Sequence, residues 1–460
     1  MKHTSLVLLF VLLAGGVLLA QSNPVPLIYT PLSPSGVTPG HAAFILTVGG
    51  TGFVPGAVVK ANGISLKTKF ISGSRLKAEV PAKAVAKAGT GAITVVNPGS
   101  IASNVIYFSV RNPSSGVTVA ADPAVLDGGF MGMGDFNGDH KPDIAIVSRN
   151  VEVYLNQGMG NFNDIGGPVF SAPSSWPPVM VADFNNDGNL DIAPCGGDGG
   201  PGLTCTIYFG DGKGGLKQGS LSQQVYTGVM VDINGDGILD NVAVEDPDGY
   251  GAYLAINLGN GDGTYRNVTY LPVSVGGIPV VGDFNGDGKL DVAMSTVGSS
   301  EPGPGTVAVF LGNGDGTVGN EVDYQIPWGG GYAAVADVNG DGKLDIVTSG
   351  FSVLLGNGDG TFTVGTSFSL QADWNSPIQI VDVNGDGKVD IVTPAAVNIN
   401  NNQMLYVLLG TGNGTFQTPI TFNLPPTDFF TLGIADFNND GLLDFSVSGA
   451  YQGTVLLQTQ

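Results

Sequence analysis

The stretch Asp337-Val-Asn-Gly-Asp-Gly-Lys-Leu-Asp345 is one copy of a nine-residue pattern, Asp-x-Asn-x-Asp-Gly-x-x-Asp, that occurs seven times in this chain of 460 residues. The first Asp of each copy stands at position 135, 183, 232, 283, 337, 382 or 436. One copy departs from the pattern, because His140 stands where the other six have Gly. The copies are spaced by 45 to 54 residues, and so constant a period indicates a repeat architecture.

Each period contains four short runs of strand-forming residues. An apolar run such as Ala334–Ala336 precedes the pattern, and a β-branched run such as Asp345–Ser349 follows it. A third run, for example Thr306–Leu311, leads through a Gly-rich turn into a fourth. Four strands in each of seven periods predict an all-β fold, a seven-bladed β-propeller over residues 116–460. The last period lacks one strand, and we expect Gly116–Ala121 to supply it and close the ring.

Oxygen-bearing side chains alternate within each copy of the pattern. Oxygens at positions 1, 3 and 5, a backbone carbonyl near position 7 and a carboxylate at position 9 are hard ligands at a spacing that suits Ca²⁺. Gly at position 6 permits the positive φ of a sharp turn. We therefore expect up to seven structural Ca²⁺ ions. The predicted ligands are Asp135, Asn137, Asp139, Asp143, Asp183, Asn185, Asp187, Asp191, Asp232, Asn234, Asp236, Asp240, Asp283, Asn285, Asp287, Asp291, Asp337, Asn339, Asp341, Asp345, Asp382, Asn384, Asp386, Asp390, Asp436, Asn438, Asp440 and Asp444.

Two other interpretations of the pattern need weighing. Asp, Asn and Gly are good turn formers, which would explain a single copy without a metal. Seven copies with three Asp each place 21 carboxylates in seven loops, and their mutual repulsion favours a counter-ion. An EF-hand is excluded, because position 12 never holds Glu and the residues after position 9 have β character. The first site is expected to be the weakest, since His140 replaces Gly there.

Charge divides the chain into two parts. Residues 21–112 carry eight Lys or Arg against the single acid Glu79, whereas residues 113–460 carry eight against 38 acids. An acidic ring repels nucleic acid and anionic membranes, so neither is expected as its partner. The excess of Lys in the first part fits three interpretations: contact with an anionic polysaccharide, contact with the acidic ring, or a solvated surface.

The N-terminus has the form of an export signal. Lys2 and His3 precede an apolar run over residues 6–20 that is too short for a comfortable membrane span. Residues 1–20 are therefore predicted to be a signal peptide, with an uncleaved anchor as the alternative. Later apolar runs are too short to span, so we expect no membrane insertion of the mature chain and a secreted, periplasmic or cell-surface location.

Cysteine and histidine usage argues against common catalytic arrangements. In an oxidising compartment Cys195 and Cys205 are predicted to form a disulfide, with two buried thiols on neighbouring strands as the alternative. Only His41 and His140 remain once the signal is removed, and each falls in a turn or metal loop. This nearly excludes a Ser-His-Asp or Cys-His arrangement and a zinc site. No catalytic residue is predicted.

The repeat as a whole resembles a known family. The succession of strand, Asp-Phe-Asn-Gly-Asp-Gly, strand and Leu-Gly-Asn-Gly-Asp-Gly-Thr-Phe (residues 355–362) is similar to the FG-GAP/VCBS repeat of bacterial secreted proteins and of the integrin α-chain propeller, over residues 113–460. The resemblance implies Ca²⁺ in the loop between the first and second strands of each blade. It does not identify a ligand, because the repeat occurs in adhesins, lectin-like proteins and lyases.

A second resemblance covers the first part of the mature chain. Residues 25–110 contain short β-type runs between turns such as Pro31-Leu-Ser-Pro34 and Asn62-Gly63. They resemble an IPT/TIG immunoglobulin-like domain, which implies a small β-sandwich that acts as a spacer or docking module. Residues 111–115 are the expected linker to the ring.

These features favour a non-catalytic binding or adhesion module, with a glycan or an extracellular protein as ligand, over an enzyme. The alternatives are an extracellular polysaccharide lyase or hydrolase on a propeller scaffold and a structural surface-layer component. We expect ligands on the face opposite the metal loops, where turns and connectors differ between periods. Aromatic side chains in the connectors are candidate ligand contacts, unless they fill gaps between blades. They are Trp176, Tyr226, Trp328, Tyr332, Trp374, Phe429 and Phe430.

Overall fold

The computed structural model is built from β-strands, in agreement with the all-β prediction. It describes residues 23–120, 124–148, 150–167, 179–196, 204–219, 227–245, 252–274, 276–297, 303–368, 376–397, 402–425, 429–449 and 452–459. Within these ranges there are 38 strands and one 3₁₀ turn, η1 (Ala82–Val85). No helix in this part of the chain is long and apolar enough to cross a membrane.

The first nine strands form two sheets that pack face to face, and we call them the N-terminal unit. One sheet has the order β1 (Leu27–Ile28), β3 (Phe44–Thr51), β7 (Arg75–Val80), β6 (Lys67–Ser72). The other has the order β2 (Gly36–Val37), β9 (Ile106–Val110), β8 (Gly89–Val96), β4 (Val58–Ala61), β5 (Ile64–Ser65).

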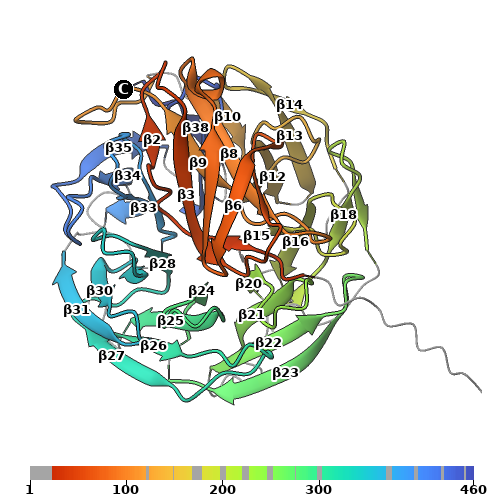
Figure 1. The fold of residues 1–460 in the computed structure, drawn as a ribbon, viewed down its shortest axis with the longest axis vertical. Coiled ribbons are helices and arrows are strands. Elements are labelled where there is room, and N and C mark those ends of the chain that lie inside the picture. The colour runs from red at the N-terminus through yellow and green to blue at the C-terminus, as the bar shows by residue number, and fades with distance from the viewer. Residues whose placement is uncertain are drawn as a thin grey trace, which may run out of the picture.

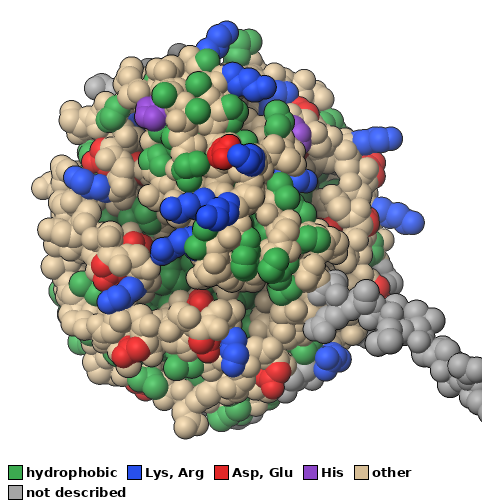
Figure 2. Space-filling model, in the orientation of Figure 1, with side chains coloured by type: hydrophobic (Ala, Val, Ile, Leu, Met, Phe, Trp, Pro, Cys, Tyr) green, Lys and Arg blue, Asp and Glu red, His purple; other side chains and the backbone are tan. Residues whose placement is uncertain are grey.

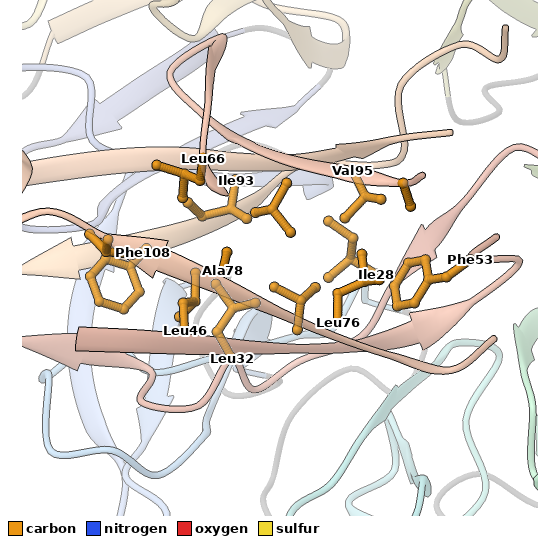
Figure 3. Packing of buried hydrophobic residues seen from close by; sticks show 14 of the residues in the cluster. Ile28, Leu32, Leu46, Phe53, Leu66, Leu76, Ala78, Ile93, Val95 and Phe108 are labelled. Atoms are coloured by element: carbon orange, nitrogen blue, oxygen red, sulfur yellow. The ribbon is translucent and has the colours of Figure 1, made fainter. Parts of the chain in front are cut away.

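The core of the N-terminal unit lies between its two sheets (Figure 3). Residues of β7 alternate between exposed and buried, as expected of a strand with one face on a core. Leu46 and Leu76 from one sheet face Ile93, Val95 and Phe108 from the other, and all five are buried. Each such side chain stabilises the fold by about 1.5 to 3 kcal/mol relative to its exposure in water.

The remaining strands form seven sheets of at least four strands each, arranged around a ring (Figure 1). We number them sheets 1 to 7 in chain order of the strand that precedes each carboxylate loop. Their members are as follows. Sheet 1 has β11 (Phe130–Gly134), β12 (Asp143–Val147), β13 (Val151–Gly158) and β14 (Asn161–Asp164). Sheet 2 has β15 (Val179–Ala182), β16 (Asp191–Gly196), β17 (Thr204–Cys205), β18 (Tyr208–Gly210) and β19 (Leu216–Gln218). Sheet 3 has β20 (Gly228–Val231), β21 (Asp240–Glu245), β22 (Tyr253–Gly259) and β23 (Tyr265–Pro272). Sheet 4 has β24 (Val280–Gly282), β25 (Asp291–Val297), β26 (Gly305–Phe310) and β27 (Val322–Ile326); sheet 5 has β28 (Ala333–Ala336), β29 (Asp345–Thr348), β30 (Ser352–Gly356) and β31 (Phe362–Ser367); sheet 6 has β32 (Gln379–Val381), β33 (Asp390–Val397), β34 (Asn402–Leu408) and β35 (Ile420–Leu424); sheet 7 has β36 (Phe429–Ala435), β37 (Asp444–Gly449), β38 (Gln452–Leu456) and β10 (Ala124–Asp127).

Hydrophobic clusters join each sheet to the next all the way around the ring. One cluster lies at each of the seven junctions, and each combines buried residues of two neighbouring sheets. At the junction of sheets 7 and 1, for example, Phe437 and Val455 pack with Ile144, Ile146 and Tyr154. The second strands are buried on both faces for this reason, and their runs are continuously apolar rather than alternating.

Sheet 7 combines strands from the two ends of the ring-forming chain, as expected, but its closing strand differs from the predicted one. Strand β10 pairs antiparallel with β38, with Ala124 opposite Val455 and Asp127 opposite Gln452. Of the described residues 116–120 in the predicted segment, Val119 forms an isolated antiparallel bridge with Gln458, just beyond β38. The apolar character of that segment has another cause, because Val117 is buried in the cluster between sheets 6 and 7.

Candidate metal centre

Each copy of the carboxylate pattern forms the loop between the first and second strands of one sheet, and in sheet 5 the loop joins β28 to β29. Asp337 Oδ1 accepts hydrogen bonds from the backbone N–H of Gly340 (2.7 Å) and Asp341 (3.1 Å). Its Oδ2 accepts from Gly342 N (2.8 Å), and Asn339 Oδ1 accepts from Asp341 N (2.9 Å). Position 9 begins the second strand, so a strand follows each loop where an EF-hand would have a helix.

Two positions of every loop have left-handed backbone. In the sheet 5 loop these are Gly340 (φ 76°) and Gly342 (φ 83°), at positions 4 and 6. Where position 4 is not Gly it is Asn, at Asn186 (φ 59°) and Asn439 (φ 60°), and Asn tolerates this region better than most residues. The pattern therefore selects residue types that allow the chain to turn tightly around its own carboxylates.

The Asp at position 9 is fully buried and links its loop to the third strand of the same sheet. Asp345 Oδ2 accepts from Val338 N (2.9 Å), and its Oδ1 accepts from Gly356 N (2.8 Å). Burial is the main cause that raises the pKa of Asp345 to about 6, and the nearby carboxylates of Asp337 and Asp341 raise it further. The same two bonds recur in the other sheets at Asp143, Asp191, Asp240, Asp291, Asp390 and Asp444.

The chemistry of the loop residues fits a hard divalent cation. Each loop contains three carboxylates and one side-chain amide, and the carboxylates at positions 1 and 5 raise the pKa of the one at position 9 in every loop. Proximity of like charges is relieved when a cation binds between them. In the ranges that the structure describes, no three His, Cys, Asp or Glu side chains converge on one point as in a formed metal shell. The carboxylates bond to backbone N–H groups instead, and calcium binding stays a prediction.

The first loop differs from the others in ways that bear on cation binding. His140 occupies position 6 with a φ of 66°, and its Nδ1 lies 3.5 Å from Asp135 Oδ2. Lys141 Nζ lies 2.7 Å from Asp139 Oδ2, closer than in the equivalent pairs Lys343–Asp341 (3.7 Å) and Lys388–Asp386 (3.8 Å). Although burial raises the pKa of Asp139, its bonds to Lys141 outweigh this and lower the pKa overall. The closer lysine and the left-handed His140 distinguish this loop, and its weakness as a site stays a prediction.

A recurrent bond between neighbouring sheets involves position 2 of the loop, which sequence reasoning had not selected. In sheet 5 this residue is Val338, whose carbonyl accepts from Gly414 N (3.1 Å) in the Gly-rich turn of sheet 6. Phe284 accepts in the same way from Gly360 N (3.1 Å), one sheet earlier. The position 2 side chains are all buried, and their repeated Phe, Ile or Val is the signal that could have revealed them.

The N-terminal unit covers the side of the ring that carries these loops (Figure 1). The backbone N–H of Val25 donates to Asp232 Oδ2 (2.8 Å), and Ser35 Oγ donates to Asp382 Oδ2 (2.8 Å). Further bonds run from Asp283 N to Tyr29 Oη (2.9 Å), from Asp337 N to Thr30 O (3.3 Å), from Thr51 Oγ1 to Gly288 O (3.1 Å) and from Arg111 Nη1 to Val383 O (2.8 Å). The loops of sheets 3 to 6 therefore contact the N-terminal unit directly.

The predicted aromatic ligand contacts fall mostly outside the described residues. Trp176, Tyr226 and Trp374 lie outside them, as do the side chains of Phe429 and Phe430. Trp328 and Tyr332 are half-buried and pack against the cluster between sheets 5 and 6. That placement agrees with the gap-filling alternative for these two residues and leaves the ligand role of all seven a prediction.

A cavity of about 270 Å³ lies among the first strands of sheets 1, 2, 6 and 7. Met131, Met133, Val181 and Leu432 contribute apolar side chains to it, although most of the surface exposed within it is polar. Gln379 contributes a side-chain amide to the lining, and its Nε2 donates a hydrogen bond to the backbone carbonyl of Leu432 (2.7 Å). The cavity therefore combines apolar side chains with exposed polar groups, and no titratable side chain is among its described lining residues.

Cys195 and Cys205 form a disulfide, which confirms the predicted pairing. Cys195 on β16 lies directly opposite Cys205 on β17. Both are buried in the cluster between sheets 2 and 3. The bridge belongs to the framework of sheet 2 and not to a reactive site.

The fold and its loops define an all-β repeat protein with a conserved carboxylate turn in each repeat unit. A family model described as FG-GAP-like repeat matches residues 135–193, 232–294, 295–348 and 395–447, so the chain contains FG-GAP-like repeats. These matches confirm the repeat predicted from the sequence.

Relatives of known name match the chain over part of their length. Cartilage acidic protein 1 of Homo sapiens is 29% identical over 218 residues, which are 45% of this chain and 26% of that protein; the Mus musculus protein of the same name is 29% identical over 220 residues, 45% of this chain and 27% of that protein. The chain thus spans about a quarter of the length of these relatives. Among solved structures, an auxiliary nutrient binding protein from Bacteroides ovatus shares 12% identity, covering 95% of this chain and 98% of its own. Its TM-score of 0.36 is too low to indicate a function.

Proposed function

We propose that the protein is an exported, calcium-stabilised, seven-bladed β-propeller with an IPT/TIG-like sandwich in front of it, and that it acts as a non-catalytic binding or adhesion module. Its ligand is a glycan or an extracellular protein. The observation that carries this proposal is the repetition of one carboxylate loop at the same place in seven similar sheets. Repetition of this kind builds a rigid scaffold, whereas a catalytic centre needs a single special constellation.

Calcium would serve the scaffold. The residues at positions 1, 3, 5 and 9 of each loop would hold the ion, and a bound Ca²⁺ supplies positive charge that offsets the repulsion of three carboxylates. If each site had a dissociation constant of ~0.1 mM in ~1 mM Ca²⁺, each ion would add about 1.4 kcal/mol to the free energy of unfolding. The acidic charge of residues 113–460 supports this role, because metal-free loops would repel one another.

The placement of the two histidines supports binding over catalysis. His41 Nδ1 lies 2.7 Å from the carbonyl of Ala42 in an exposed turn, and His140 lies beside Asp135 in the first loop. The position 9 carboxylates, whose pKa values burial raises, have both oxygens bonded to backbone N–H groups. Such groups are structural acceptors and are poorly placed to act as a general base.

The disulfide and the location of the N-terminal unit support the rest of the proposal. A disulfide persists in oxidising compartments, which favours a secreted, periplasmic or cell-surface protein. Because the N-terminal unit lies over the loops, we expect a ligand of the ring to approach the opposite face.

A glycan array probed with the recombinant mature chain, with and without Ca²⁺, tests the proposal. We expect binding to a defined set of glycans, and weaker binding after chelation as the scaffold loosens. A parallel incubation with uronic-acid polysaccharides, followed by absorbance of unsaturated products, tests the enzyme alternative. Steady formation of such products by the purified chain would contradict a non-catalytic role.

A further inference from the structure

The exposed face of the β3–β7–β6 sheet carries most of the positive charge of the N-terminal unit. Lys67 and Lys69 on β6 and Arg75 and Lys77 on β7 are all exposed, and the acid among them is Glu79. Figure 2 shows basic side chains gathered on the side of the N-terminal unit that faces the viewer, with the ring behind. We call this surface the basic face.

The basic face is not used to hold the N-terminal unit on the acidic ring. Of the eight Lys and Arg in residues 21–112, Arg111 is buried and bonds to a ring carbonyl. Lys67, Lys69, Arg75, Lys77, Lys83 and Lys87 are exposed, and Lys60 is half-buried. The bonds to the loops come instead from backbone groups and from Ser35, Thr51 and Tyr29. Attraction to the ring therefore does not account for the excess of positive charge.

Strand register places like charges next to one another on the basic face. Lys69 on β6 lies directly opposite Lys77 on β7, and Arg75 is two residues from Lys77 on the same strand face. Like charges directly opposite in a sheet are destabilising. Lys67 is relieved by Glu79, with Nζ 2.7 Å from Oε1, but within the described residues Lys69, Arg75 and Lys77 form no ion pair. This arrangement is unfavourable alone and becomes favourable when an anionic partner binds.

We propose that the basic face binds an acidic polysaccharide, one chain of uronic-acid or sulfated sugars lying across β3, β7 and β6. This inference rests on the proposed function. It names the class of ligand and places a second ligand-binding surface on the N-terminal unit, in addition to the face of the ring opposite the loops. From Lys67 to Ile71 a strand extends about 14 Å, and three strands span about 10 Å, which suits a short length of one polysaccharide chain. Ile45 (48% exposed) and Ile71 (43% exposed) on the same face offer apolar contact to sugar rings.

The charge of the rest of the molecule favours a thin, sparsely charged polymer over nucleic acid or a membrane. Residues 113–460 carry 38 acids and repel any broad anionic surface that approaches within a Debye length of about 8 Å. A duplex or a bilayer would bring many phosphates near the ring, whereas a single polysaccharide chain can stay on the sheet. The basic face is also small, with three cations that lack an acidic partner among the described residues, too few for tight non-specific binding to nucleic acid.

The test is titration calorimetry of the full mature chain, in Ca²⁺, with hyaluronate and heparin as acidic probes and dextran as the neutral one. We expect binding of an acidic probe that weakens with added NaCl, and no binding of dextran. The double variant K69Q/K77Q should weaken binding at least about tenfold, since each lysine near an anionic surface contributes on the order of a factor of five. The matched control K213Q/K217Q removes two exposed lysines from sheet 2 and should bind as the unmodified chain does.

Melting curves of both variants establish that they remain folded. Equal binding by K69Q/K77Q and the unmodified chain would overturn the inference, as would tighter binding to duplex DNA or phosphatidylserine vesicles than to the acidic polysaccharides. Binding of a neutral glycan or a protein alone would also overturn it, while the proposed function would stand. Failure to bind any glycan or protein probe would contradict the proposed function itself.

Discussion

The backbone N–H of Val25, near the start of the N-terminal unit, donates a 2.8 Å hydrogen bond to Oδ2 of Asp232, 207 residues away in the loop of sheet 3. The same oxygen accepts from Gly237 N (2.8 Å) within its own loop. Asp232 is buried, and burial is the main cause that raises its pKa to about 6. The carboxylate of Asp232 thus shapes a candidate metal loop and also anchors the N-terminal unit.

Substitution of Asp232 should therefore loosen the N-terminal unit as well as its own loop. We expect Asp232→Ala to increase hydrogen exchange at the Val25 amide by at least about tenfold, because a buried bond is lost. The measurement is hydrogen exchange of peptides that contain Val25. Asp183→Ala is the matched control, since Asp183 has the same position in sheet 2 and accepts from Asp187 and Gly188 of its own loop. Equal exchange in both variants would show that the Val25 bond does not hold the unit in place.

Backbone conformation at position 6 should limit which residues the loops tolerate. Gly342 has a φ of 83°, and a Cβ there would meet no atom within 4 Å. Gly342→Ala should therefore destabilise the protein by about 1 kcal/mol or more through backbone strain alone, and Gly342→Asn should cost less. Urea unfolding of the two variants measures the difference. If Ala and Asn cost the same, side-chain contacts rather than the left-handed backbone would govern this position.

The loops were predictable from sequence because everything that defines them is local. Asp, Asn and Gly at set positions encode the turn, and the constant period assigns each turn to one sheet. The covering of the loops by the N-terminal unit was not predictable, since its bonds come from the amide of Val25 and the hydroxyl of Tyr29, which carry no sequence signal. The closing strand was misplaced because Val117 is apolar for packing between sheets and not for pairing.

Chelation should lower the melting temperature and reverse the pH dependence of stability. In the metal-free protein burial raises the pKa to about 6 at Asp345 and to about 8 at Asp240, Asp390 and Asp444. The unfolded chain has Asp pKa values near 3.9, so folding takes up protons between these limits. Stability is then highest at low pH and is lost as pH rises through 6 to 8. We expect the melting temperature in EDTA to be higher at pH 5.5 than at pH 8.

Saturating Ca²⁺ should change the sign of that slope, because the ion favours ionised carboxylates and competes with protons. The calcium-loaded protein is therefore expected to melt at least as high at pH 8 as at pH 5.5. Differential scanning fluorimetry at both pH values, with metal analysis of the chelated sample, gives the comparison. Identical curves with and without the metal would contradict structural calcium.

Removal of the disulfide should destabilise sheet 2. The bridge closes a loop over a sequence separation of 10 residues, and the double variant C195S/C205S should lower the free energy of unfolding by about 2 to 3 kcal/mol. Denaturant unfolding measures the loss. Alkylation of the purified protein without reduction is the direct check on the bridge, and modification of both thiols would refute it.

A buried amide should contribute to the stability of the seam between sheets 1 and 7. Asn156 is 1% exposed, and its Nδ2 donates to Phe437 O (3.0 Å) across the seam and to Pro142 O (3.2 Å) within sheet 1. Without the Asn156 amide, Phe437 O would retain the longer hydrogen bond from Gly160 N (3.4 Å). Asn156→Ala leaves buried carbonyls poorly paired, so we expect a loss of about 1 to 3 kcal/mol in the free energy of unfolding. The neighbouring Gln157 is exposed, and Gln157→Ala should change stability by less than about 0.5 kcal/mol. Urea unfolding of the pair decides the question, because equal losses would mean that the bonds of Asn156 add nothing to the other contacts of the seam.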